Sequence, residues 1–285
     1  MKKFGLILKK IRESKGLSLA NVAGNNISKS QLSRFENGET DITLDKLLSV
    51  LDVLNVSIRE FIYMGHGFHR DGLSELIDEM RKYCNRNDSR SLKKLLIHYL
   101  ENQKDTLNNK LAVILIKAKL QEIEGINHLE KEDVAFMSDY LFNVDTWGEY
   151  ELKLFSNTME LFSQSSVTIL TKEMVRRSDF YRSLPSHRRL ISNMLLNAFS
   201  LSVKRNQIVD ADYFRQQLHQ LFFDETELYE RLIFHFIDSC YFYRLSHNAK
   251  EILEMRKCIG LLKAVGSSDL AKRWEDYLQD ILAFK

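Results

Sequence analysis

Hydrophobic residues recur at helical spacing along this chain. Near the amino terminus, Phe4, Leu8 and Ile11 fall on one side of a helix predicted over residues 4–16, and Gly16 can end that helix. From residue 73 to residue 284 the same spacing persists, and no run alternates between apolar and polar residues as a strand would. The pattern therefore predicts an all-α protein.

Four more short helices are predicted before residue 65. They cover residues 17–23, 28–38, 44–51 and 57–62. Ser18 can cap the second helix, and Gly24, Asn25 and Asn26 tolerate the positive φ of a tight turn. Five short helices, with a tight turn between the second and the third, predict a helix-turn-helix domain over residues 1–65.

The third of these helices carries the most informative chemistry. Ser28 can cap its amino end and Gly38 can close its carboxyl end, while Leu32 and Phe35 face inward. Its outward side chains suit the major groove of DNA, where Arg and Lys recognise guanine and Gln recognises adenine. The candidate DNA-binding residues are Lys29, Ser30, Gln31, Ser33, Arg34 and Asn37, together with Lys9 of the first helix. The alternative is a capped surface helix with no special role.

Charge is segregated within this domain. Residues 1–34 contain eight basic side chains and one acidic side chain, whereas residues 35–65 contain two basic and six acidic ones. The formal net charge of the whole chain is only +2. A local basic face attracts phosphates through counterion release whatever the total charge. The distribution therefore favours DNA binding over a merely solvated helix face.

A series of short motifs between residues 4 and 63 identifies the domain more closely. They are Ile11-Arg12-x-x-Lys15-Gly16-Leu17-Ser18, Val22-Ala23, the segment from Ser28 to Gly38, Leu44-x-x-Leu47-Leu48, Leu54-Asn55-Val56-Ser57 and Glu60-Phe61. In these motifs the sequence resembles the lambda-repressor-like, or XRE, DNA-binding domains. The resemblance implies that Arg12 and Glu36 form a structural pair between the first and third helices. Two features depart from the family: the segment from Ala23 to Ser28 is one residue short, and Leu19 stands where many relatives carry Gln.

Composition favours neither an enzyme nor a membrane protein. Cys84, Cys240 and Cys258 form no Cys-x-x-Cys motif, which favours buried thiols in a reducing compartment. The eight histidines show no metal-ligand spacing, and we assign His66 and His69 to a linker. We therefore expect no catalytic residue, no metal ion and no cofactor. No apolar run approaches the about 20 residues that span a bilayer, and no signal region follows the basic amino terminus, so we expect a cytoplasmic protein.

Three glycines within residues 64–72 predict a linker, which we place at residues 66–72, before a helical domain over residues 73–285. About eleven helical segments follow, including one predicted over residues 147–162 and one over residues 167–184. Helices of this length with short polar turns predict stacked antiparallel pairs, a TPR-like α-solenoid in geometry, because the strict repeat consensus is absent. The alternative is a compact helical bundle that only dimerises.

Further motifs extend across both domains. They are the shortened turn leading into Ser28–Glu36, Met80-Arg81-Lys82-Tyr83, Asp139-Tyr140-Leu141-Phe142-x-Val144-x-x-Trp147-Gly148-x-Tyr150-Glu151, and Leu170-Thr171-Lys172-Glu173-Met174-Val175. With them the whole chain resembles the Rgg/GadR/MutR transcriptional regulators of Gram-positive bacteria. The resemblance implies a homodimer that binds double-stranded promoter DNA and, in quorum sensing, a short hydrophobic signalling peptide.

The same resemblance points to four candidate peptide-binding residues on the inner face of the solenoid: Arg81, Asn157, Asn193 and Tyr229. Asn193 is the strongest candidate, because it interrupts the apolar segment 191–196 and an amide can bond both donors and acceptors of an extended peptide. An amide bonded to a neighbouring helix is the structural alternative. The alternative function is a ligand-independent regulator whose helical domain only dimerises; the intact recognition helix disfavours a pure interaction scaffold.

Overall fold

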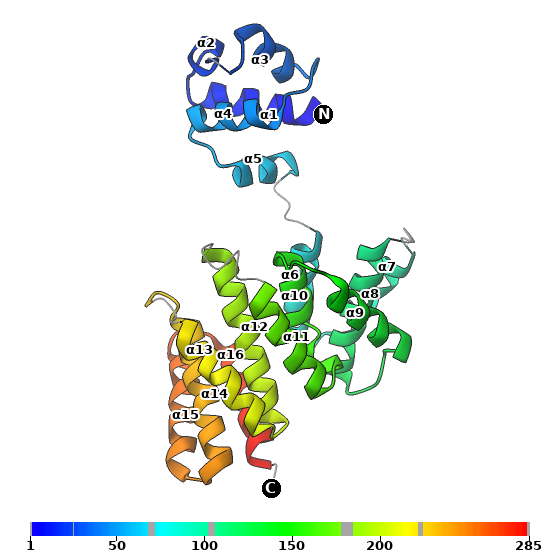
Figure 1. Cartoon of the computed structure of the whole chain (residues 1–285), viewed down its shortest axis with the longest axis vertical. Helices are drawn as coiled ribbons and strands as arrows, with labels where there is room; N and C mark the ends of the chain where they lie inside the picture. The colour runs from blue at the N-terminus through cyan, green and yellow to red at the C-terminus, as the bar shows by residue number, and fades with distance from the viewer. Residues whose placement is uncertain are drawn as a thin grey trace. The chain divides into compact units, whose positions relative to one another are not determined.

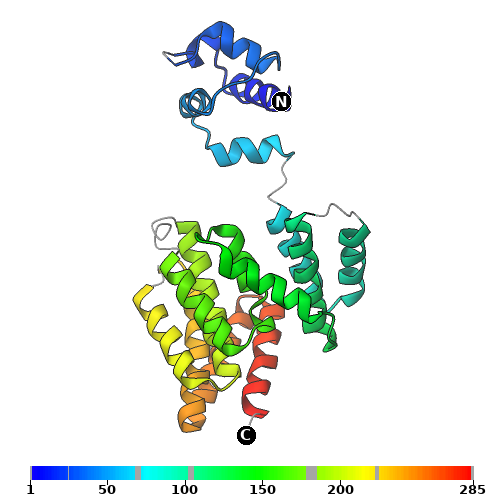
Figure 2. The same ribbon diagram turned by 45° about the vertical axis from the view of Figure 1, so that its right-hand side comes forward.

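A computed structural model of the chain describes residues 2–24, 26–67, 72–101, 106–177, 185–221 and 225–283. Within these ranges every regular element is a helix and no strand occurs, as the hydrophobic pattern predicts (Figures 1 and 2). The chain divides into two compact units, Met1–Glu79 and Met80–Lys285. The exact limits of the predicted domains stay a prediction.

The amino-terminal unit begins with five helices: α1 (Lys2–Ser14), α2 (Leu19–Val22), α3 (Lys29–Glu36), α4 (Leu44–Leu54) and α5 (Ile58–Gly65). α1 packs against α3 and α5, while α2 packs against α3 and α4. Their apolar sides form one core, in which Leu8, Leu32, Leu51 and Phe61 are almost completely buried. This is the predicted five-helix arrangement, and its core fixes α3 with one side free.

The turn between α2 and α3 differs in detail from the prediction. Gly24 does not have a positive φ, and Asn25 lies outside the described residues. Ala23 is extended, with φ −67° and ψ 125°, and the Asn26 side-chain amide donates to Ser49 Oγ of α4 at 2.8 Å. A side-chain bond to α4 therefore helps to hold this connection.

Eleven helices and one 3-10 helix follow in the described part of the chain. They are α6 (Gly72–Asn85), α7 (Ser89–Glu101), α8 (Leu107–Glu124), α9 (Lys131–Asn143), α10 (Glu149–Ser156), η1 (Met159–Leu161), α11 (Gln164–Arg177), α12 (Pro185–Lys204), α13 (Ile208–Leu221), α14 (Leu228–Ser246), α15 (Ala249–Ala264) and α16 (Ser268–Ala283). Successive helices pair, as in α7–α8, α12–α13 and α14–α15, and α12 also contacts α10 and α14. The result is the predicted α-solenoid.

Residues 147–162 do not form the single helix that the hydrophobic pattern predicts. α10 ends at Ser156, and η1 follows after a short turn. The backbone N–H of Asn157 bonds to Leu154 O at 3.2 Å, and its side-chain amide donates to Lys153 O at 2.8 Å in place of a helical N–H. An Asn side chain can compete with the backbone in this way, which ends the helix.

Two further expectations meet the structure only in part. α11 ends at Arg177, and residues 178–184, predicted to continue it, lie outside the described residues. Cys240 and Cys258 are buried and free, as predicted, whereas Cys84 is only half-buried. Burial raises the pKa of the Cys258 thiol to about 11 and also raises the pKa of the Cys84 thiol.

Candidate functional site

The third helix is held at both ends by local hydrogen bonds. Ser28 Oγ accepts the backbone N–H of Gln31 at 3.2 Å, as expected of an N-cap. At the other end Gly38 has φ +73°, and its N–H bonds to Phe35 O at 2.9 Å. A residue with a side chain rarely adopts this left-handed conformation, so Gly38 ends α3 where the sequence predicts.

One side of α3 is buried and the other is available to a partner. Leu32 is fully buried and Phe35 is 7% exposed, whereas Lys29, Ser30, Arg34 and Asn37 are exposed. The remaining predicted DNA-binding residues, Gln31, Ser33 and Lys9, are half-buried. With the described residues, Arg34 forms no side-chain hydrogen bond or ion pair. Its guanidinium is therefore not engaged by the described part of the protein.

Arg12 and Glu36 form a two-point ion pair. Arg12 Nε donates to Glu36 Oε1 at 2.8 Å, and Arg12 Nη2 donates to Oε2 at 2.7 Å. The two side chains are only 8% and 3% exposed. Arg12 Nη1 also donates to Leu17 O at 2.8 Å, so one guanidinium joins α1, the segment before α2 and the end of α3. The hydrogen bond to Glu36 raises the pKa of Arg12 against the opposing effect of burial.

One polar contact beside α3 is not predicted by the sequence. The Lys46 ammonium, in the first turn of α4, donates to Gln31 Oε1 at 3.1 Å. Nothing in the sequence pattern signals this bond, because it joins two helices whose relative placement depends on the whole core.

The four predicted peptide-binding residues lie on different elements of the carboxyl-terminal unit. Arg81 is on α6, Asn157 follows α10, Asn193 is on α12 and Tyr229 is on α14. Burial raises the pKa of the Tyr229 hydroxyl, while the positive charges of Arg273 and Arg81 oppose this shift. The structure thus brings Arg81 and Tyr229 into one electrostatic neighbourhood.

Asn157 and Asn193 differ in what their amides can still bond. The Asn157 NH2 group is used within its own chain segment, on Lys153 O. Asn193 is half-buried, and its side chain has no hydrogen-bond partner among the described residues. One turn further along α12, the Asn197 amide donates to Ser156 O at 3.2 Å, which joins α12 to the end of α10. Asn193 is therefore the amide that remains available.

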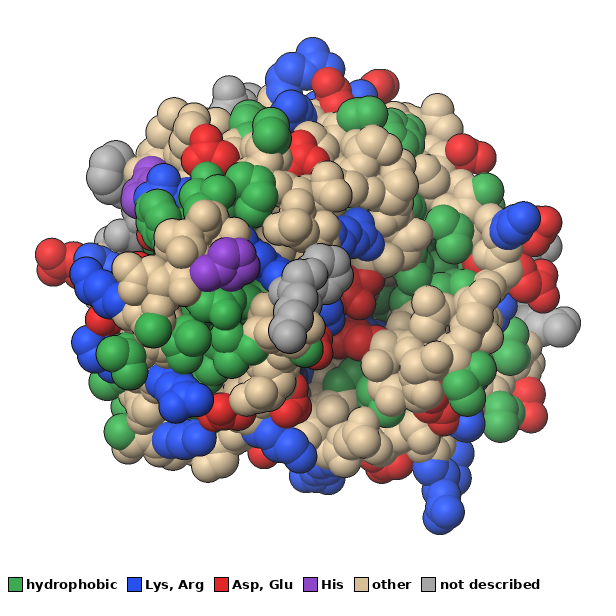
Figure 3. Space-filling model, turned by 90° about the horizontal axis from the view of Figure 1, so that it is seen from below, with side chains coloured by type: hydrophobic (Ala, Val, Ile, Leu, Met, Phe, Trp, Pro, Cys, Tyr) green, Lys and Arg blue, Asp and Glu red, His purple; other side chains and the backbone are tan. Residues whose placement is uncertain are grey.

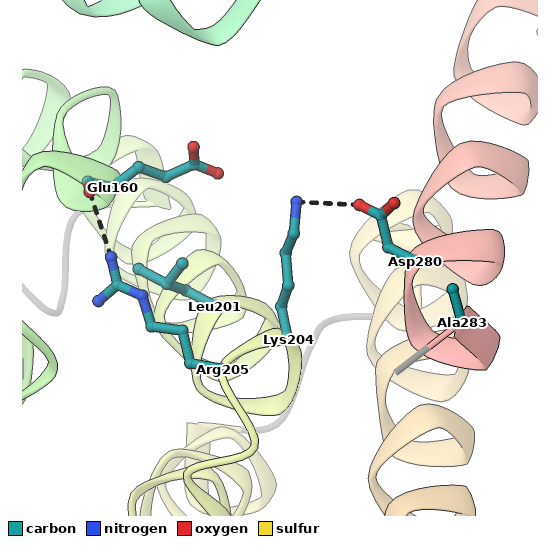
Figure 4. Close-up of a pocket in the computed structure, with 6 residues that line it drawn as sticks. All are labelled: Glu160, Leu201, Lys204, Arg205, Asp280 and Ala283. Carbon is teal, nitrogen blue, oxygen red and sulfur yellow. Dashed lines mark hydrogen bonds and ion pairs between the residues drawn. The ribbon is translucent and has the colours of Figure 1, made fainter. Parts of the chain in front are cut away.

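A pocket opens further along α12. Its volume is about 540 Å³, and it is lined by Glu160, Leu201, Lys204, Arg205, Asp280 and Ala283 (Figure 4). Lys204 and Asp280 form an ion pair across it at 3.1 Å, and Arg205 Nη2 donates to Glu160 O at 3.2 Å. The space-filling view shows a hollowed surface in which acidic and basic side chains lie together (Figure 3).

Helical spacing relates this pocket to Asn193. Asn197, Leu201 and Lys204 lie four, eight and eleven positions after Asn193. All four residues therefore fall on one side of α12. The sequence contains that spacing, and it could have added Asn197, Leu201 and Lys204 to the candidates. Together they form a strip of polar and apolar groups leading from the free amide of Asn193 to the pocket.

The described residues contain neither a candidate metal-binding cluster nor a helix that could span a membrane. In the ranges that the structure describes, no cluster of three or more His, Cys, Asp and Glu side chains could hold a metal ion. Among the same residues, no helix is long and apolar enough to cross a bilayer.

Comparison with known proteins matches both units. A model of the C-terminal domain of the HTH-type transcriptional regulator Rgg matches residues 92–276, and a helix-turn-helix model matches residues 8–61. The structure of the SHP pheromone receptor Rgg2 from Streptococcus dysgalactiae is similar, with 28% identity and a TM-score of 0.78, covering 97% of this chain and 98% of that chain.

Two more distant structures share the fold. A protein from Listeria monocytogenes EGD-e has 20% identity and a TM-score of 0.83, covering 99% of this chain and 97% of its own. PrgX in complex with cCF10 has 17% identity and a TM-score of 0.75, covering 99% of this chain and 93% of its own.

Proposed function

Because the chain belongs to the Rgg family of HTH-type transcriptional regulators, we propose that it binds promoter DNA through α3 and a short hydrophobic peptide through its carboxyl-terminal unit. The observation that supports the proposal most directly is the free, exposed side of α3, held in place by the buried Arg12–Glu36 pair. A helix fixed in this way can enter the major groove without first being ordered.

In this proposal the predicted DNA-binding residues divide by their chemistry. Arg34 binds a guanine edge, because its guanidinium can donate two hydrogen bonds to O6 and N7. Lys9 and Lys29 bind phosphates, which contribute affinity but little sequence preference. Ser30, Gln31, Ser33 and Asn37 complete the polar contacts with the bases and the backbone.

The peptide half of the proposal rests on Asn193 and the strip that continues from it. One relative is named a pheromone receptor, and PrgX was solved with cCF10. In this chain, the amide of Asn193 can bond to a peptide main chain, while Leu201, which is 8% exposed, and Ala283 offer apolar contacts in a pocket that charged side chains otherwise line. Arg81, Asn157 and Tyr229 extend the proposed binding surface.

We also propose that the regulator is a homodimer. Leu253 and Leu261 of α15 and its C-cap residue Val265 are 59%, 56% and 74% exposed, and an exposed apolar row supports self-association. Two recognition helices related by a two-fold axis would lie roughly 34 Å apart, so the operator should be an inverted repeat with half-sites about one helical turn apart. A regulator that dimerises without a peptide remains the second candidate, because the same row supports it.

Variants at two basic residues test the DNA-binding half. Arg34→Ala should weaken specific binding by about 1–3 kcal/mol and relax the preference at one base pair in each half-site. Lys9→Ala should instead weaken all sequences alike and lower the salt dependence of binding. Footprinting and binding titrations at several salt concentrations separate these effects. Unchanged sequence selectivity in Arg34→Ala would remove Arg34 from base recognition.

A further inference from the structure

The side chain of Gln31 is held from the protein side by Lys46. Lys46 Nζ lies 3.1 Å from Gln31 Oε1, and both side chains are half-buried. An ammonium group has three donors and no acceptor, so only the amide oxygen of Gln31 can face it. The orientation of the amide is therefore determined chemically: the oxygen is turned toward α4 and the NH2 group away from Lys46.

A glutamine whose amide can rotate freely does not discriminate strongly between base pairs. It can present its NH2 group or its oxygen to a base by rotating about the last torsion of its side chain, which is broad and roughly two-fold. Each orientation complements a different pattern of donors and acceptors in the major groove. Holding one orientation before DNA binds removes that choice and part of the entropy lost on binding.

We propose that Lys46 is a positioning residue for base recognition, fixing the orientation in which the Gln31 amide meets DNA. The inference rests on the proposed function, since it needs α3 in the major groove. Lys46 touches the recognising side chain rather than the base. Its effect on base preference should therefore be confined to the base pair that Gln31 contacts, and the preference at the base pair contacted by Arg34 should be unchanged.

Charge is the main confounding effect. Lys46→Met removes a positive charge near DNA as well as the hydrogen bond, so overall affinity should fall on every sequence. Lys10→Met is a matched control, because Lys10 is an exposed lysine of α1 with no side-chain contact among the described residues. Lys46→Arg keeps both the charge and a donor and should preserve the base preference.

The experiment selects bound sequences from randomised duplex DNA with the full-length wild-type protein. Affinities are then measured on the selected duplex and on each of its single-base variants. The base pair that loses its preference in Gln31→Met marks the Gln31 contact. At that base pair, Lys46→Met should reduce discrimination by about two- to tenfold, the effect of releasing one ordered side chain. In the Gln31→Met background, Lys46→Met should have no further effect on it.

The outcomes separate the two proposals. Selection of no preferred sequence by the wild type would overturn sequence-specific binding, and this inference with it. A clear operator on which Lys46→Met keeps full discrimination at the Gln31 base pair would overturn only the role of Lys46. An equal loss at every base pair, matching Lys10→Met, would also overturn it, because Lys46 would then act on DNA only through its charge. Thermal melts of the variants show that each is folded.

Discussion

Two residues of α3 that lie two positions apart illustrate how differently charged side chains act in one short helix. Glu36 is 2% exposed and bonded twice to Arg12, whereas Arg34 is exposed and has no partner among the described residues. Removing one member of a buried ion pair leaves the other charge desolvated and unpaired, which costs far more than losing an exposed charge.

Glu36→Ala should therefore destabilise the amino-terminal unit by about 3–5 kcal/mol, and DNA binding should fall together with the melting temperature. Arg34→Ala should change stability by no more than about 0.5 kcal/mol while it weakens DNA binding. Thermal or urea unfolding of the two variants, alongside operator titrations, measures both effects. Equal melting temperatures would contradict the structural assignment of the pair.

Acid sensitivity in the carboxyl-terminal unit should depend on Glu124. Its carboxylate lies 2.6 Å from Lys93 Nζ and 2.8 Å from His128 Nε2, and the bond to Lys93 is the largest cause that lowers its pKa to about 2. A carboxylate whose pKa is lower in the folded state stabilises the fold above its unfolded pKa of about 4.3. That stabilisation is lost as the pH falls toward about 2.

The unfolding free energies of the wild type and of Glu124→Gln, measured with urea at several pH values, should differ in a way that depends on this pH range. The difference in unfolding free energy should shrink steadily as the pH falls between about pH 4 and pH 2. Glu101→Gln, at an exposed residue without a hydrogen bond or ion pair to a described residue, is the matched control for removing one carboxylate. A difference independent of pH would show that Glu124 acts through packing.

At the scale of the helices, α1 and α3 are in close contact at Gly5. A Cβ atom added there would overlap the backbone carbonyl oxygen of Phe35, which cannot move without shifting α3. Gly260 offers a contrast, because it lies within α15 and no atom lies within 4 Å of an added Cβ. The same substitution should therefore have opposite effects at the two positions.

Gly5→Ala should destabilise the amino-terminal unit by about 1–3 kcal/mol, as expected for overpacking, and should weaken DNA binding because α3 is displaced. Gly260→Ala should stabilise the chain by up to about 1 kcal/mol through helix propensity alone. Unfolding curves of both variants measure the contrast. Stabilisation by Gly5→Ala would show that α1 can move away from α3 without cost.

Local sequence signals account for most of these elements. Ser28 and Gly38 define α3 because capping and left-handed backbone conformation depend on the residue itself. The hydrophobic pattern does not predict the end of α10. Asn157 competes for Lys153 O through a side-chain hydrogen bond, and hydrophobic periodicity carries no information about such a bond. The pattern does not predict the contact of Lys46 with Gln31 either, since this contact depends on how two helices pack in three dimensions.

At the scale of the whole molecule, the sequence predicts two units with separate chemistry, and the family match covers both. The candidate peptide-binding residues have weaker local signals than the helix-turn-helix domain and stay a prediction. Arg81, Asn157, Asn193 and Tyr229 come from four different elements, and no local pattern relates them. The helical spacing of Asn193 with Asn197, Leu201 and Lys204 is present in the sequence, but it does not show which amide stays unpaired.

The whole-molecule prediction concerns how peptide and operator affect each other. If Asn193 bonds to a peptide main chain, Asn193→Ala should cost about 1–3 kcal/mol, which is roughly tenfold to a hundredfold in peptide affinity. DNA binding by the peptide-free variant should stay close to that of the wild type. The measurement is titration of a labelled short hydrophobic peptide into both proteins. Identical affinities would assign Asn193 to helix packing.

Repeating the titration with saturating operator tests the coupling itself. Binding free energies are reciprocal, so a peptide that changes operator affinity by some factor must have its own affinity changed by the same factor. A peptide that binds tightly yet leaves operator affinity unchanged must instead act on the DNA-bound protein. Absence of binding by the wild type would favour the ligand-independent regulator, because the amide of Asn193 and the pocket beyond it would then have no peptide to hold.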